Sequence, residues 1–175
     1  MGPKRKPRHK RTSAAKDRGT ACDAGPTYTK MDFMGRATLI TESSTNRSIP
    51  GIVLIFDTPL PLHELQAILE DRLIKSNIKY RSVVEGSESW RELPPSQLRV
   101  ANHIQVHELP ENATYSDLSF ALGALTSRPL PTDRPLWEAI LLPRYRTGSV
   151  VLVRQHHCLA DGASIVLTIR ALSDA

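Results

Sequence analysis

The chain has 175 residues and a formal net charge of +5, and 40% of its residues are hydrophobic. This length predicts a single domain with a real core. Its apolar runs are far shorter than the roughly 20 residues of a membrane-spanning helix, and its N-terminus lacks the apolar stretch of a secretory signal. The two cysteines, Cys22 and Cys158, form no CxxC pair. We therefore expect an intracellular, cytoplasmic protein without a transmembrane segment.

The positive charge is concentrated at the N-terminus. Residues 1–18 contain eight Lys or Arg and one Asp, whereas the rest of the chain has 15 basic and 17 acidic residues. Such a polar segment cannot bury apolar area, so residues 1–26 are predicted to be a disordered basic tail. Three interpretations of the tail are open: a solvated segment without a specific partner, a nuclear-localisation-like address, or a segment that is attracted to anionic membranes. We expect peripheral membrane contact through residues 1–18, and no binding to nucleic acid.

The remaining residues, 27–175, alternate between strand and helix patterns. Residues 49–56 (IPGIVLIF) form a β-branched run that predicts a central strand. Residues 60–76 carry leucines at helical spacing on one side and charges on the other, which predicts an amphipathic helix. Residues 81–86 and 104–109 predict two further strands.

The second part of the domain continues this alternation. Residues 114–128 predict another amphipathic helix, with a Thr or Ser at its start to cap it. Residues 135–145 and 148–157 predict two strands joined as a hairpin, with Gly148 in the turn. Residues 161–175 predict a last helix. Mixed strands and helices predict an α/β fold, in which helices pack on a mixed sheet.

The strongest chemical signal lies where the last strand meets the last helix. His156 and His157 are adjacent, and Asp161 and Gly162 follow. Neighbouring strand residues point to opposite faces, so only one histidine can face a given cleft, and joint ligation of a metal is not expected. A histidine with a pKa near 6.5 can accept a proton from a hydroxyl or thiol at neutral pH. Asp161 can cap the helix, and Gly162 permits a tight turn or a positive φ.

These residues carry a resemblance to a known family. The stretch HHCLADG resembles the HHxxxDG signature of the coenzyme A-dependent acyltransferase superfamily and of the related condensation domains. Upstream, RPLWE is similar to a segment of the bacterial-type wax ester synthase/diacylglycerol acyltransferases, and the TKMDFM stretch resembles the start of that family. The resemblance covers residues 27–175. The family's PLW triplet is here Pro135, Leu136 and Trp137.

The resemblance implies the N-terminal half of a coenzyme A-dependent acyltransferase-like fold, with the active site in a channel between two halves. Because the chain stops after its last helix, we expect it to be part of a larger protein. The implied reaction transfers a fatty acyl group from acyl-CoA, as co-substrate, to a long-chain alcohol or diacylglycerol. The products are wax esters or triacylglycerol, and no permanently bound cofactor or metal is expected.

The family also implies roles for individual residues. His157 corresponds to the general base, while Asp161 and Gly162 shape the turn. His156 either packs behind the base or acts directly. The PLW residues are candidates for substrate contact, although Trp137 is expected to pack in the core. Cys158 is expected to be buried rather than nucleophilic.

Other hypotheses remain open at this stage. Another HHxxxDG enzyme, such as a plant-type alcohol acyltransferase or a peptide-bond-forming condensation domain, shares the motif. The HxxxxD pattern of glycerol-phosphate acyltransferases also fits, but those enzymes lack a PLW segment. A different class is a non-catalytic module that binds lipid or a partner through an exposed inner face.

Overall fold

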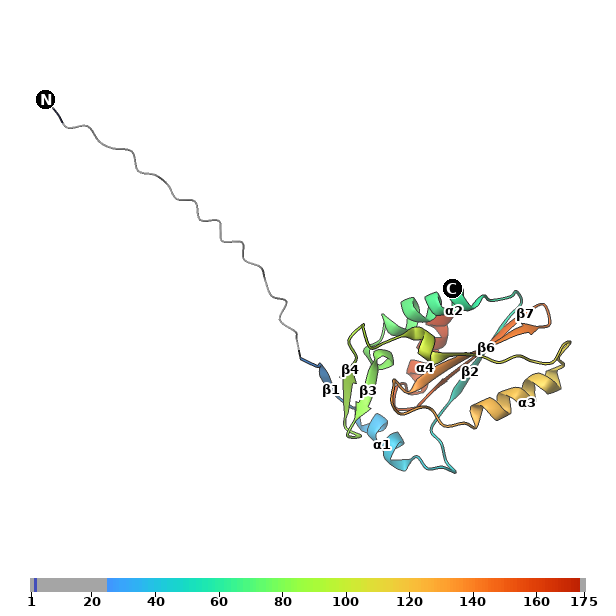
Figure 1. Ribbon diagram of the computed structural model, residues 1–175. Helices are drawn as coiled ribbons and strands as arrows, with labels where there is room; N and C mark the ends of the chain where they lie inside the picture. Colours follow the sequence, from blue (N-terminus) through green and yellow to red (C-terminus); the bar gives the residue numbers. More distant parts are fainter. Residues whose placement is uncertain (1, 3–24, 174–175) are drawn as a thin grey trace.

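The structure is a computed structural model that describes residue 2 and residues 25–173 (Figure 1). Two sheets with helices packed against them make up the described part, which confirms the predicted α/β class. The predicted disordered tail falls almost entirely outside the described residues and stays a prediction.

The larger sheet has four strands in the order β2-β7-β6-β5. These strands are β2 (Gly51–Phe56), β7 (Gly148–Gln155), β6 (Trp137–Tyr145) and β5 (Ile104–Val106). β7 pairs antiparallel with both β2 and β6, whereas β5 runs parallel to β6. All of β7 and most of β6 are buried, because helices cover both faces of the sheet. This burial explains why the two strands have almost continuous apolar sequences.

The position of β2 differs from the prediction. It was expected to be a central strand, but within the described residues it pairs only with β7 and lies at the sheet edge. Ile52 is buried, whereas Val53 and Ile55 are 41% and 61% exposed. An apolar run alone does not distinguish a strand covered on both faces from one covered on a single face.

The β6–β7 hairpin forms as predicted, but Gly148 has a different role. The positive φ angles belong to Arg144 (58°) and Arg146 (53°), and Gly148 begins β7. A Cβ atom at Gly148 would clash with the carbonyl of Phe56 on β2. Glycine is therefore required here for the close approach of two strands rather than for the turn.

A smaller antiparallel sheet has the order β1-β4-β3. Its strands are β1 (Tyr28–Lys30), β4 (Ser89–Glu92) and β3 (Ser82–Glu85). The sequence predicted β3 but not β1 or β4. Strands of three or four residues are too short to show a period of two, so they give no sequence signal.

Helices cover both faces of the larger sheet (Figure 1). The first face meets α2 (Leu62–Leu69), its π-helical continuation Glu70–Ile74, and α4 (Gly162–Leu172), and the opposite face meets α3 (Tyr115–Thr126). Thr114 caps α3 in a capping box with Asp117. A further helix, α1 (Phe33–Thr41), was not predicted, and two 3₁₀ turns span Ile78–Arg81 and Val100–His103. Within the described residues, no helix is both long and apolar enough to cross a membrane.

Candidate active site

The two histidines lie in a turn that is fixed by its backbone. β7 ends at Gln155, so the histidines follow the strand instead of continuing it. The His156 N–H donates to the Leu136 carbonyl at 2.9 Å, and the His157 N–H donates to the Ser48 carbonyl at 2.7 Å. The turn is therefore attached both to the PLW segment and to the residues that precede β2.

The side chain of His156 is buried in the protein interior. Its side chain is 3% exposed, and its Nδ1 accepts a hydrogen bond from the Cys158 N–H at 3.1 Å. The remaining proton must then be on Nε2, which lies 2.9 Å from Oε2 of Glu42 and donates to it. Burial lowers the pKa of His156, although Glu42 opposes the shift. His156 is thus a neutral imidazole with a fixed tautomer and both nitrogens engaged.

His157 has the opposite environment. Its side chain is half-buried, and no hydrogen bond to its ring is found within the described residues. The two side chains thus differ in burial, and because both residues lie in the turn after β7, strand pleating does not set this difference. The site therefore provides one imidazole that is held by its backbone and keeps its ring free for proton transfer.

Asp161 and Gly162 form the start of α4. One carboxylate oxygen of Asp161 accepts a hydrogen bond from the Ser164 N–H at 2.8 Å, so Asp161 is the helix cap. This hydrogen bond is the main reason that the pKa of Asp161 lies below its ordinary value. Gly162 does not use the positive φ that glycine permits, because it is the first residue of α4, and a Cβ there would meet no described atom within 4 Å.

The PLW residues are mainly part of the core. Trp137 is 1% exposed, its Nε1–H donates to the Tyr80 carbonyl at 2.8 Å, and its ring stacks on His103 at 4.3 Å. Leu136 and Pro135 are also buried, and Pro135 contributes to the wall of a surface pocket. Trp137 therefore packs in the core as expected, whereas substrate contact by the PLW residues stays a prediction.

A buried ion pair connects the PLW segment to the histidine motif. Glu138 follows the triplet and is the register partner of Arg154 on β7. Nη1 of Arg154 lies 2.5 Å from Oε1 of Glu138, and both side chains are almost fully buried. Gln105 donates to the other Glu138 oxygen at 3.0 Å. Sequence analysis missed this pair, although a lone arginine within an otherwise apolar strand was a possible signal.

Helix α1 supports the turn from the other side. Asp32 caps α1 by accepting from the Gly35 N–H at 2.7 Å, and its carboxylate also pairs with Lys79 at 3.1 Å. A Cβ at Gly35 would lie 3.3 Å from the Cys158 carbonyl, so helix and turn are in close contact. Glu42, just after α1, reaches His156 across 114 residues of sequence. Sequence analysis missed Glu42 and Lys79, because such separations leave no local pattern.

The structure also bears on Cys158 as a nucleophile and on a metal site. Cys158 is buried, and this burial raises the pKa of its thiol to about 12. The thiolate that a nucleophile needs is therefore not formed at neutral pH. Within residues 25–173, no group of three His, Cys, Asp or Glu side chains is arranged to hold a metal ion.

Comparison with known proteins identifies the family. The family model for the wax ester synthase/diacylglycerol acyltransferase catalytic domain matches residues 64–175. A candidate diacylglycerol O-acyltransferase of Mycobacterium tuberculosis H37Rv is 28% identical over 126 residues, which cover 71% of this chain and 27% of the relative. A second one from that strain is 29% identical over 130 residues, which cover 69% of this chain and 28% of the relative. The chain thus spans about a quarter of the length of these relatives.

Solved structures show the same fold. The wax ester synthase/diacylglycerol acyltransferase of Marinobacter aquaeolei VT8 matches with a TM-score of 0.60 at 20% identity, over 79% of this chain and 37% of that one. The first condensation domain of the calcium-dependent antibiotic synthetase matches with a TM-score of 0.62 at 18% identity, over 83% of this chain and 37% of that one. Together with the match of the family model, these similarities show that the chain belongs to the wax ester synthase/diacylglycerol acyltransferase family.

Proposed function

We propose that the chain provides the general base of an O-acyltransferase. The enzyme transfers a fatty acyl group from acyl-CoA, its co-substrate, to a long-chain alcohol or diacylglycerol. The observation that carries the proposal is the contrast between the two histidines: His156 is buried with both ring nitrogens engaged, and His157 is half-buried with its ring unengaged. Family membership supports the chemistry, and relatives named as candidate diacylglycerol O-acyltransferases support the acceptor.

In this mechanism the imidazole of His157 takes the proton from the acceptor hydroxyl. The hydroxyl oxygen bonds to the thioester carbon, the carbon–sulfur bond breaks, and the proton passes to the departing thiolate. The products are an ester and free CoA. A positioned base of this kind contributes on the order of 10²–10⁴-fold to the rate. The thioester is already activated, so no covalent acyl-enzyme is required, in agreement with a Cys158 thiol that stays protonated.

His156 and Glu42 act as positioning residues in this proposal. Glu42 accepts from the ring of His156 and so fixes the residue next to the base. The Ser48 carbonyl accepts from the backbone N–H of His157 itself. Asp161 serves the same purpose by starting α4 directly after the turn. Anionic lipid attracted by basic residues 1–18 brings the enzyme to the membrane that contains its acceptor.

The test uses the protein encoded by the whole reading frame that contains this chain. Palmitoyl-CoA is supplied with hexadecanol or diacylglycerol, and ester and free CoA are measured. His157→Ala should remove nearly all turnover, whereas His156→Ala and Glu42→Gln should leave more. The exposed His63 on α2 provides the matched control, His63→Ala, which should have no effect. Turnover that survives His157→Ala contradicts the assignment of the base, and a wild-type protein without turnover on either acceptor favours a non-catalytic lipid-binding module.

A matching experiment concerns residues 1–175 alone. We expect no turnover from them, because holding thioester and hydroxyl in near-attack geometry is worth roughly 7–11 kcal/mol and the relatives use a much longer chain. Turnover by this segment that His157→Ala abolishes would show that it builds a complete site.

A further inference from the structure

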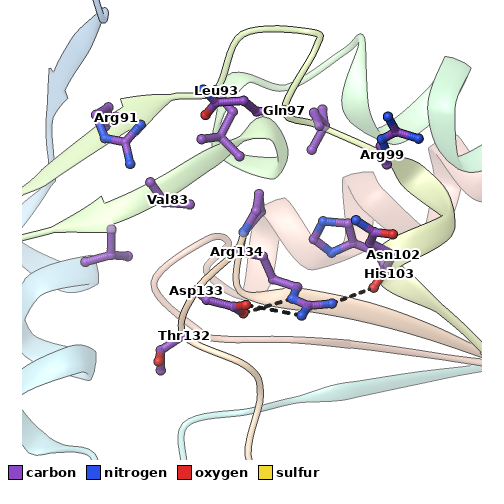
Figure 2. Close-up of a pocket in the computed structure, with 13 residues that line it drawn as sticks. Val83, Arg91, Leu93, Gln97, Arg99, Asn102, His103, Thr132, Asp133 and Arg134 are labelled. Carbon is purple, nitrogen blue, oxygen red and sulfur yellow. Dashed lines mark hydrogen bonds and ion pairs between the residues drawn. The ribbon is translucent and has the colours of Figure 1, made fainter.

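A second site is indicated by a pocket on the surface beside the PLW segment. The pocket has a volume of about 390 Å³, within the range of small-molecule sites, and it lies between the small sheet, the loop after β4 and the residues before β6 (Figure 2). Three guanidinium groups line it, those of Arg91, Arg99 and Arg134, and Asp133 is the only carboxylate among the lining residues. This excess of positive charge suits an anion.

Arg134 is held in a fixed orientation. Its Nε and Nη2 donate to the two oxygens of Asp133 at 2.9 and 3.3 Å, and its Nη1 donates to the Asn102 carbonyl at 2.9 Å (Figure 2). Each terminal nitrogen keeps one further N–H. A guanidinium that is already ordered loses little conformational entropy when an anion binds to it.

The other two arginines have donors to offer. Arg99 is exposed, and its side chain has no hydrogen bond or ion pair within residues 25–173. Arg91 uses its Nε for Glu85 at 2.7 Å, which leaves its terminal nitrogens available. The pocket thus combines one ordered guanidinium with N–H donors that water alone satisfies.

His103 provides the independent observation that points to a ligand. The side chain lines the pocket although it is only 3% exposed, and its Nδ1 donates to the Trp137 carbonyl at 2.9 Å. Nε2 is therefore a hydrogen-bond acceptor, and it has no partner among the described residues. Burial lowers the pKa of His103, with a smaller contribution from Arg134, although the Trp137 carbonyl, Asp133 and Glu138 oppose the shift. This nitrogen is not one of the fully buried side-chain atoms without a partner, so water reaches it from the pocket, and a ligand can donate to it in place of that water.

These two requirements together select the ligand. Guanidinium groups need negatively charged oxygens, whereas Nε2 of His103 needs a hydroxyl hydrogen. Sulfate and carboxylate are pure acceptors at neutral pH, but a phosphomonoester has a second pKa of about 6 and can present P–O⁻ and P–OH on one group. We propose that this pocket binds hydrogenphosphate or a phosphomonoester, with the charged oxygens on Arg134 and Arg99 and the P–OH donating to Nε2 of His103.

The site goes beyond the proposed acyl transfer and does not depend on it. It lies close to the histidine turn along the backbone, since Pro135 lines the pocket and the next carbonyl, that of Leu136, accepts from the His156 N–H at 2.9 Å. Binding can be measured on residues 1–175 without any turnover. A failure of this site and a failure of the acyltransferase are therefore distinguishable.

The first experiment is calorimetric titration of the chain with sodium phosphate and with sodium sulfate, at pH 6.5 and equal ionic strength. Phosphate should bind about tenfold or more tighter than sulfate, because only phosphate can donate to Nε2. Arg99→Gln should weaken phosphate binding by about fivefold or more, and Arg134→Gln should weaken it further. Arg170→Gln, on the exposed side of α4, removes the same charge and should leave the affinity unchanged. Arg99 is exposed and unpaired, so its variant should remain folded even if Arg134→Gln does not.

The second experiment identifies the source of the phosphate. CoA is compared with 3′-dephospho-CoA, and vesicles containing phosphatidate, a monoester, are compared with vesicles containing phosphatidylglycerol, a diester. Preference for the monoester in either pair, lost in Arg99→Gln, supports the site and names its ligand as soluble or lipid. The two kinds of vesicle are prepared with equal surface charge, because phosphatidate carries more negative charge per lipid and would otherwise attract the basic residues 1–18 more strongly. Equal affinity for phosphate and sulfate, or phosphate binding that survives both arginine substitutions, overturns the proposal.

Discussion

Removing Glu138 should destabilise the protein strongly, because this change leaves a buried arginine without its counter-ion. Arg154 is fully buried, and its Nη1 lies 2.5 Å from Glu138. Its Nη2 donates only to the carbonyls of Thr126 and Arg128, and its Nε has no partner within the described residues. In Glu138→Ala these neutral carbonyls alone would have to stabilise the charge.

The expected size of the effect follows from the burial. Breaking a buried ion pair by removing one partner costs about 3–5 kcal/mol. A domain of this size has a total stability of roughly 5–15 kcal/mol, so the loss is a large fraction of it. At about 2–4 °C per kcal/mol, the melting temperature should fall by roughly 6–20 °C. Replacing both partners by apolar residues, as in Glu138→Leu with Arg154→Met, should recover most of the loss.

Thermal and urea unfolding followed by circular dichroism would measure these differences. Arg128→Ala is the control, because the Arg128 side chain is 44% exposed and lies 3.8 Å from Glu138. The arginine end of this long contact is solvated, so its loss should cost about 1 kcal/mol or less. The reasoning is refuted if Glu138→Ala costs no more than Arg128→Ala, or if the apolar double substitution is as unstable as the single one.

Three further predictions concern charge and burial. Deleting residues 1–18 should reduce binding to anionic vesicles, which should also weaken with salt, whereas salt-independent binding after the deletion would assign it to the domain. In a Cys22→Ala background, the Cys158 thiol should not react with a thiol reagent at pH 8 until the protein is unfolded, because its pKa is raised to about 12. Burial lowers the pKa of His103 and of His156, so the unfolded state binds more protons just below pH 6.5. The free energy of unfolding should therefore fall as the pH is lowered through this range, by up to about 1.4 kcal/mol per unit for each histidine. A His156→Gln variant with an unchanged slope would contradict that histidine's part.

Sequence patterns predicted the type of element where periodicity was strong. They failed where contacts between distant parts of the chain determine the structure. The leucine spacing of α2 and α3 and the apolar runs of β6 and β7 were sufficient, because burial imposes those patterns directly. The edge position of β2 depends on which face neighbouring elements cover. The requirement for Gly148 comes from Phe56, more than 90 residues away in the sequence.

The candidate site shows the same division. The adjacent histidines and the PLW triplet were recognisable as local motifs. Glu42, Lys79 and Arg154 were not, because each acts through a partner that the fold brings from another element. The sequence left open a tight turn or a positive φ at Gly162, and the structure makes the position the first residue of a helix, which Asp161 caps.

In the proposed mechanism, two neighbouring imidazoles meet two conflicting demands on a catalytic base. A base must keep a ring nitrogen free to receive a proton, but a side chain without hydrogen bonds is poorly oriented. Here the orientation comes from neighbours: His156 uses both of its nitrogens on the protein, and the Ser48 carbonyl fixes the N–H of His157. His157 can then leave its ring unengaged without leaving its backbone loose. Changes at His156 or Glu42 should therefore act on the base through the main chain, which explains why they should lower turnover without abolishing it.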